Sequence, residues 1–213
     1  MKAVSRDLRN RAYGQENALT AVDRLGVRLS ARRVRKVVDS FSGLRMADIG
    51  CGYHATLSRS FLNEVASLLL VDVALSDEVK RVKNVHAIEG TLPQALEEVD
   101  DAALDLIVCN SVLEHLWEPA ITLGHFTRML KPGGTALINV PSWRGKRFLE
   151  FSAFRLGLSP AEEMQDHKTY YDPRDLWPLL VRGGFRPSDI RCFTHKLGLN
   201  TFAICHKARR GNT

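Results

Sequence analysis

The chain has 213 residues, of which 45% are hydrophobic and 25% charged, and its formal net charge is +6. This length can bury one sizeable core, and the composition is that of a globular domain. The sequence contains no run of about 18 apolar residues, so no membrane span is expected. Its polar, basic start lacks the apolar segment of a signal peptide. The four cysteines are widely spaced without a C-x-x-C pair, which favours a reducing cytoplasm.

The positive charge is concentrated near the N-terminus. Residues 1–47 hold 11 lysines and arginines against 4 acidic residues, a net +7 that leaves −1 for the rest of the chain. We therefore expect residues 1–43 to form a basic helical segment that meets an acidic partner, either a phosphorylated substrate or a membrane surface. The alternative is a solvated helix face. Nucleic acid is not expected, because stacking aromatics are not interleaved with these basic residues.

Helix and strand patterns alternate along the chain. Ser30 is predicted as the N-cap of a helix that places Val34, Val37, Val38 and Phe41 on one face. Further along, we expect strands over residues 44–50, 67–73, 84–90, 104–110 and 135–141, and helices over residues 56–66, 92–99 and 120–130. The alternation predicts a doubly wound α/β sheet that binds ligands at the carboxyl ends of its strands.

After the fifth strand the pattern changes. An insertion that mixes aromatics and arginines fills residues 142–165, and a helix that opens at Asp172 or Pro173 follows it. Two strands, over residues 188–195 and 199–207, then close the chain. They are joined so closely that an antiparallel hairpin is the simplest arrangement.

The stretch "ADIGCGYHAT", residues 47–56, fits two cofactors. Gly50 and Gly52 allow the close backbone approach that both a dinucleotide and a sulfonium cofactor need, and Asp72 could take the ribose hydroxyls of either. Asp48 favours the sulfonium cofactor over the dinucleotide. A carboxylate is repelled by a pyrophosphate, whereas it is attracted to an ammonium and a sulfonium group. His54 stands at a position where a third glycine would fit the turn with less strain, because the Cβ of histidine restricts positive φ.

The motifs "ADIGCG", "LLLVDV", "DLIVCNSVLEHLWEP", "MLKPGGTALINVP" and "YYDPRDLWPLLVRGGF" follow one another at the intervals of a known family. Over residues 44–207 the chain resembles class I S-adenosylmethionine-dependent methyltransferases, in particular the small-molecule branch with the ubiquinone-biosynthesis enzymes and methyltransferases of polysaccharide and natural-product pathways. The resemblance implies a Rossmann-like seven-stranded sheet of order 3-2-1-4-5-7-6 with strand 7 antiparallel. It also implies a methyltransferase domain over residues 44–213, with an insertion at 142–171 that covers the substrate.

The resemblance assigns roles around the cofactor. Asp48 would orient the methionine ammonium group, Asp72 would accept both ribose hydroxyls, and Asn110 would close over the methionine end. Thr91 stands where the family often has an aspartate for the adenine amino group, so a contact there would use a hydroxyl instead of a carboxylate. The remaining cofactor contacts would come from Gly50, Cys51, Gly52, Tyr53, Val73 and Leu92.

The pair Glu114-His115 has two interpretations. Some relatives bind a divalent metal through E-x-x-E-H, but here the first position is Ser111, so no metal is expected. His115, with Glu114, could serve as a general base, or the pair could be a structural helix start.

The substrate is expected to be a small acidic, lipid-linked or sugar-type metabolite methylated on oxygen or nitrogen. Trp143 and Arg144 of the insertion are expected to contact it. The resemblance adds His167, Tyr170 and Tyr171, because it implies that their segment returns over the substrate pocket. The rival functions are a nicotinamide oxidoreductase and a non-catalytic partner protein that binds S-adenosylmethionine. The sequence does not predict an oligomeric state.

Overall fold

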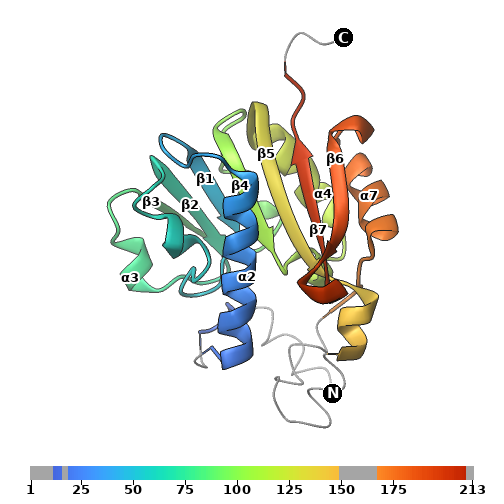
Figure 1. The fold of residues 1–213 in the computed structure, drawn as a ribbon. Helices are drawn as coiled ribbons and strands as arrows, with labels where there is room; N and C mark the ends of the chain where they lie inside the picture. The colour runs from blue at the N-terminus through green and yellow to red at the C-terminus, as the bar shows by residue number, and fades with distance from the viewer. Residues whose placement is uncertain (1–11, 16–18, 149–166, 210–213) are drawn as a thin grey trace.

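The computed structural model describes residues 12–15, 19–148 and 167–209, and it centres on a seven-stranded sheet (Figure 1). The strands are β1 (Arg45–Ile49), β2 (Ser67–Asp72), β3 (Val85–Glu89), β4 (Leu104–Asn110), β5 (Leu130–Pro141), β6 (Ile190–His195) and β7 (Asn200–His206). They run in the order β3-β2-β1-β4-β5-β7-β6. Of these seven strands, β7 alone runs in the opposite direction to the others, and it pairs antiparallel with β5 and β6. The predicted sheet order and the closing hairpin are confirmed.

Both faces of the sheet are covered, and β1 shows how consecutive residues of one strand contribute to both cores. Successive side chains of a strand point to opposite faces. Ala47 and Ile49 accordingly join the hydrophobic core on one face, while Met46 joins the core on the other. A parallel strand covered on both sides needs apolar residues at every position rather than at alternate ones.

Helices cover the two faces of the sheet. Leu123 and Phe126 of α4 (Pro119–Met129) and Leu176 of α7 (Pro173–Arg182) pack in the first core. Val34 of α2 (Ala21–Val37) and Val79 of α3 (Asp77–Lys80) pack in the second. Figure 1 shows α2 crossing in front of the sheet. The 3-10 turns are η1 (Ser58–Phe61), η2 (Gln94–Leu96), η3 (Leu113–His115), η4 (Pro187–Asp189) and η5 (Lys196–Gly198), and residues 143–148 are also helical.

The N-terminal helix begins before its predicted cap. Thr20 is the N-cap: its hydroxyl accepts the amide of Asp23 at 3.2 Å, and the Asp23 carboxylate accepts the amide of Thr20 at 2.9 Å. This reciprocal pair is a capping box, a signal that the sequence contains. Ser30 instead lies inside α2 and is buried. The prediction of Ser30 as the cap is wrong, whereas the division at residue 43 stays a prediction.

Two predicted helices shrink to single 3-10 turns. In residues 56–66 the hydroxyls of Ser58 and Ser60 donate to the carbonyls of Ala55 and Leu57, three residues back. Such bonds give the backbone an alternative to helix. Residues 92–99 retain only η2.

The side chain of Arg128 explains the second loss. Its guanidinium donates to the carbonyls of Leu96 at 2.7 Å and Val99 at 2.6 Å. These carbonyls therefore find partners without a continued helix, and a side chain from α4 replaces the local hydrogen bonds that the sequence pattern favoured.

Candidate active site

The turn after β1 carries the two glycines of the sequence motif. Gly50 and Gly52 have φ values of +73° and +74°, in the left-handed region that strains other residues. A Cβ on Gly50 would lie 2.2 Å from Cγ2 of Val112, which follows β4. The amide of Gly50 donates to the Val71 carbonyl of β2 at 2.7 Å. Glycine thus lets the turn lie tightly between the ends of β2 and β4.

The second half of the turn accommodates His54 without a left-handed backbone at that residue. The positive φ, +46°, falls on the buried Ala55 instead. His54 is exposed, and its ring meets Tyr53 edge to face with centroids 4.9 Å apart. Cys51 is half-buried, and burial raises the pKa of its thiol, with Asp48 adding to the effect. A raised pKa makes this thiol a poor nucleophile.

Asp48 is a buried carboxylate directly before the glycine turn. The residue is 1% exposed, and its Oδ2 has no hydrogen-bond partner among the described residues. Burial raises the pKa of Asp48 to about 7, and the charge of Asp72 adds to this shift while Ser58 opposes it. A cation would stabilise a buried carboxylate that has one oxygen without a partner, so Asp48 can attract an ammonium group.

Asp72 ends β2 and faces the glycine turn. Its Oδ2 accepts the amide of Gly52 at 2.7 Å, and its Oδ1 accepts the amide of Val73 at 2.8 Å. Burial raises the pKa of Asp72, and these two amides oppose the rise. Each carboxylate oxygen keeps a further lone pair, so the fixed carboxylate can accept two hydroxyl groups from one ligand.

The residues after β3 lie beside the end of β2. The amide of Gly90 donates to the Asp72 carbonyl at 2.9 Å. Thr91 follows and is exposed, and Leu92 is half-buried against the first core. Both positions therefore follow directly after the residue that bonds the end of β2, and Thr91 presents a hydroxyl rather than a carboxylate.

Asn110 ends β4 within a polar group that sequence spacing did not reveal. Its Oδ1 accepts the hydroxyl of Ser30 at 2.9 Å and Nδ2 of Asn139 at 3.1 Å. The buried Oδ1 of Asn139 has no hydrogen-bond partner in the described part of the chain. These contacts anchor α2 to the carboxyl edge of the sheet. They occupy Oδ1 of Asn110, so its Nδ2 is the atom that can donate to a ligand.

The N-terminal segment also reaches the glycine turn. The carbonyl of Tyr13 accepts the amide of Tyr53 at 2.8 Å. A Cβ on Gly52 would lie 3.0 Å from the same carbonyl oxygen. Glycine at position 52 therefore permits the close approach of Tyr13, a residue that no motif in the sequence singled out.

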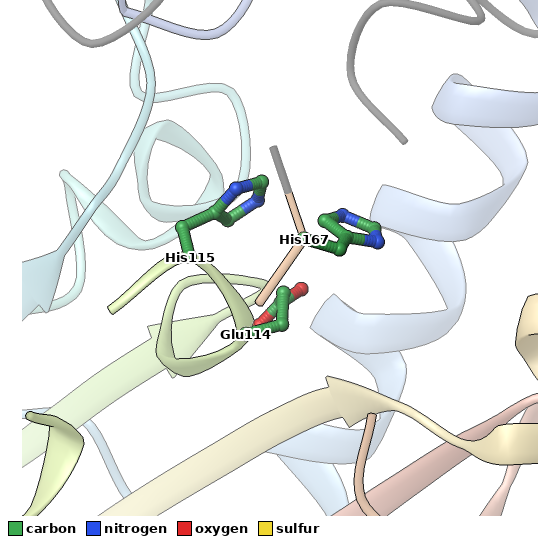
Figure 2. A group of neighbouring side chains, drawn as sticks. All are labelled: Glu114, His115 and His167. Atoms are coloured by element: carbon green, nitrogen blue, oxygen red, sulfur yellow. The ribbon is translucent and has the colours of Figure 1, made fainter. Parts of the chain in front are cut away.

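A cluster of three titratable side chains follows β4. The turn η3 supplies Glu114 and His115, and His167 approaches from the segment before α7, so that the three side chains converge (Figure 2). Their candidate ligand atoms lie within 4.8 Å of one another. The rings of His115 and His167 meet edge to face with centroids 4.6 Å apart.

Glu114 is fully buried in this cluster. Among the described residues, neither carboxylate oxygen has a hydrogen-bond partner, and burial raises the pKa of Glu114 to about 8. One carboxylate and two imidazoles can in principle hold a divalent cation. The absence of a metal was predicted from the S-x-x-E-H spacing alone, which does not include His167, and it stays a prediction.

The two tyrosines after His167 are both buried, each 6% exposed. The hydroxyl of Tyr170 lies 3.0 Å from Nδ1 of His167, which ties Tyr170 to the titratable cluster. Tyr171 packs in the first core, and burial raises the pKa of its hydroxyl to about 12. Tyr170 is therefore the better placed of the two to meet a substrate.

Trp143 and Arg144 begin the helical residues 143–148. Trp143 is 44% exposed, and its indole Nε1 donates to Asp175 at 3.2 Å. Its ring lies 5.6 Å from that of Tyr170. Arg144 is exposed and lines a pocket beside the β6–β7 turn. The structure thus brings Trp143 near the titratable cluster and turns Arg144 toward a second hollow.

Lys196, in the β6–β7 turn, was not selected from the sequence. Burial lowers the pKa of Lys196 to about 8, and the charge of Glu114 opposes this shift. A Cβ on Gly26 of α2 would lie 3.8 Å from its Nζ, so the side chain lies against that helix. Lys196 and Leu197 have φ values of +49° and +59°, a strained backbone for residues with side chains.

Gly145 offers a direct test of how tightly the β6–β7 turn is held. A Cβ on Gly145 would lie 2.0 Å from the Leu199 carbonyl oxygen. We expect Gly145→Ala to lower the free energy of unfolding by about 1–3 kcal/mol, the usual range for overpacking. Urea denaturation followed by circular dichroism measures this change.

The matched control for this substitution is Gly124→Ala in α4, where a Cβ would meet nothing within 4 Å. Alanine there should stabilise the protein by about 0.5–1 kcal/mol, because it favours helix. Equal effects of the two substitutions would contradict the close contact at Gly145.

Comparison with known proteins assigns the family. A family model described as a methyltransferase domain matches residues 15–188. The chain therefore belongs to this methyltransferase family, and with its sheet order it is a class I S-adenosylmethionine-dependent methyltransferase. The cofactor implied is S-adenosylmethionine.

Individual relatives agree. The chain is 26% identical over 194 residues to a ubiquinone biosynthesis O-methyltransferase from Xylella fastidiosa strain M23, covering 84% of this chain and 73% of the relative. It is 25% identical over 176 residues to the protein of the same name from Ralstonia nicotianae, covering 78% and 72%. In fold it resembles the crystal structure of a SAM-dependent methyltransferase from Archaeoglobus fulgidus, with a TM-score of 0.61 and 17% identity over 85% of this chain and 94% of that one.

Proposed function

We propose that this enzyme methylates an oxygen or nitrogen of a small metabolite that carries an acidic group, with a lipid-linked or sugar-type compound as the expected substrate. The observation that carries the cofactor part of this proposal is the pair of carboxylates around the glycine turn. Asp48 is buried without a full set of partners, and Asp72 is fixed by two backbone amides. The two sites match an ammonium group and a pair of ribose hydroxyls.

These residues fit S-adenosylmethionine, which when bound supplies an electrophilic methyl group on a positively charged sulfur. Asp48 attracts the ammonium group, and Asp72 accepts the ribose hydroxyls. Gly50, Cys51, Gly52 and Tyr53 form the turn beside the methionine and ribose portions.

The adenine end and the methionine end have separate contacts in this proposal. Val73, Thr91 and Leu92 cover the adenine ring, and the side-chain amide of Asn110 donates to the methionine carboxylate. Asp48 and Asn110 lie at the ends of the adjacent strands β1 and β4, so that they bind the two charged groups of one amino-acid moiety.

His115 is proposed as the general base that removes the proton of a hydroxyl or amine nucleophile. Its neighbours support this role, since candidate ligand atoms of Glu114 and His167 lie within 4.8 Å of one of its ring nitrogens and the Glu114 carboxylate, when ionised, can stabilise the protonated imidazole. The enzyme otherwise aligns the nucleophile with the methyl group and excludes water, the main requirements for a displacement with a neutral leaving group. Trp143, Arg144, Tyr170 and Tyr171 form the substrate side.

Several expectations about the surroundings of the enzyme stay predictions. Most of the insertion expected to cover the substrate, residues 149–166, lies outside the described residues. Within the described chain, no helix combines the length and apolar character that crossing a bilayer requires. Contact with a membrane surface, a cytoplasmic location and the absence of nucleic-acid binding remain proposals from charge and composition.

The pKa of Asp48 predicts a pH dependence for cofactor binding. Because this pKa is raised to about 7, the carboxyl is protonated at pH 6 and charged at pH 8, and only the charged form attracts an ammonium group. Affinity for S-adenosylhomocysteine should rise by up to about tenfold over this range. Calorimetric titration measures it. Asp48→Asn should remove the slope and the exposed control Asp39→Asn should keep it, whereas a slope retained in Asp48→Asn would contradict this role.

Methyl transfer from labelled S-adenosylmethionine to a panel of acidic and neutral hydroxyl and amine compounds tests the proposed activity. We expect turnover of an acidic member, and a lower kcat with an unchanged KM for cofactor in His115→Gln. Cofactor binding without transfer to any member of the panel would favour a non-catalytic binding protein instead.

A further inference from the structure

A second hollow opens at the same edge of the sheet, beside the β6–β7 turn. Antiparallel pairing places Asn200, the first residue of β7, opposite Pro141, the last residue of β5, so this turn lies at the carboxyl edge (Figure 1). The pocket has a volume of about 910 Å³. Its charged and titratable lining consists of Arg33, Arg144, Asp172, Arg174, His195 and Lys196.

The cations of this pocket are poorly neutralised. The four cations share the lining with a single acid, Asp172, and Lys196 also senses the charge of Glu114, which lies outside the lining. Within the described chain, no ion pair involves Arg33, Arg144 or Lys196. The ion pair of Arg174 there is a long one, with Asp175 at 3.9 Å. These side chains come from α2, residues 143–148, α7 and the β6–β7 turn, so the fold gathers positive charge that is dispersed in the sequence.

The lining is held in place before any ligand binds. The Ser142 hydroxyl donates to the Gly198 carbonyl at 2.7 Å and accepts the amide of Gly145 at 2.9 Å. The Ser142 amide donates to the Leu199 carbonyl at 3.0 Å. These bonds join the strained turn that carries Lys196 to the helical residues that carry Arg144. A fixed pocket loses less entropy when it binds a ligand.

The pKa of His195 reflects its burial and the positive charge gathered in the pocket. Burial, together with the charges of Lys196 and Arg33, lowers the pKa of His195 to about 4. His195 is thus a neutral imidazole beside fixed cations. An anion in the pocket would oppose these charges, and His195 can report its presence.

We propose that this pocket binds a phosphate or diphosphate group that is part of a soluble methyl-accepting substrate. The inference rests on the proposed methyltransferase function and assigns the acidic group of its substrate to Arg33, Arg144 and Lys196. Guanidinium groups bind phosphate oxygens through paired hydrogen bonds, and an ammonium binds them as a point charge. The pocket would anchor the substrate at the edge of the sheet that also holds the proposed cofactor site.

Inorganic diphosphate is the probe, titrated calorimetrically into full-length protein saturated with S-adenosylhomocysteine. We expect measurable binding that weakens by about tenfold or more in Lys196→Met and in Arg33→Gln, as for loss of a charged hydrogen bond. Arg32→Gln is the matched control, because Arg32 is an exposed neighbour on α2 outside the pocket. This control should bind as the wild type does. Circular dichroism establishes that each variant is folded.

A second readout separates binding in the pocket from binding elsewhere. Diphosphate should raise the pKa of His195 in an NMR pH titration, and Lys196→Met should raise it without diphosphate. The proposal fails if S-adenosylhomocysteine binds but diphosphate does not, or if diphosphate leaves His195 unchanged. Failure of S-adenosylhomocysteine itself to bind would instead overturn the proposed function.

Vesicles distinguish the source of the phosphate. Sedimentation with phosphatidic acid vesicles but not phosphatidylcholine vesicles, in protein that shows no diphosphate binding, would contradict the proposal and favour a membrane surface as the partner of these cations.

Discussion

Replacing Asp72 with asparagine is expected to weaken S-adenosylmethionine binding by about a hundredfold or more. The carboxylate is proposed to accept two ribose hydroxyls, and each hydrogen bond to a charged group contributes about 1.5–3 kcal/mol. It also fixes the glycine turn through the amides of Gly52 and Val73. Asparagine keeps the shape of the side chain but loses the charge and one acceptor oxygen. Calorimetric titration with the cofactor measures the loss.

The matched control is Asp77→Asn, in α3 shortly after β2. Asp77 is exposed, and its side chain forms an ion pair with Lys80 at 3.4 Å. This variant should bind the cofactor as the wild type does. Near-normal affinity in Asp72→Asn would show that the ribose lies elsewhere.

Glu114→Gln is expected to stabilise the ligand-free protein at pH 8 by several kcal/mol and to leave its stability at pH 5 almost unchanged. The pKa of Glu114 is raised from 4.5 to about 8 by burial, so between these values the folded state binds more protons than the unfolded state. Stability must then fall as the pH rises from about 5 to 8. Each unit of pKa difference corresponds to about 1.4 kcal/mol. Glutamine cannot ionise and removes this loss.

Urea denaturation at pH 5 and pH 8 measures the effect. Asp48, with its pKa raised to about 7, contributes a loss of the same sign that persists in the Glu114 variant. Glu118→Gln is the control, because Glu118 is exposed and should leave the pH profile unchanged. A wild-type profile in Glu114→Gln would mean that Glu114 is not desolvated in the folded protein.

The sheet could be predicted because its chemistry is local. A strand buried on both faces needs consecutive apolar residues, as in β2 and β4, and glycines mark the turn that must approach β4 closely. Helices were harder to predict. The hydroxyls of Ser58 and Ser60 and the guanidinium of Arg128 take up carbonyls that a helix would otherwise use.

Those candidate site residues that lie within a single sequence motif could be predicted. Asp48 and Asp72 follow from their positions at strand ends. The contacts of Ser30 with Asn110 and of His167 with the Glu114-His115 pair could not be predicted, since they join segments far apart in the chain. Lys196 lies in a turn without a motif, and only packing against α2 reveals its burial.

A crystal structure of the enzyme with S-adenosylhomocysteine tests the central claim most directly. The account predicts both ribose hydroxyls on the carboxylate of Asp72, the ammonium group at Asp48 and the sulfur facing the side of His115. A cofactor product bound away from the glycine turn, or a ribose without contact to Asp72, would contradict it.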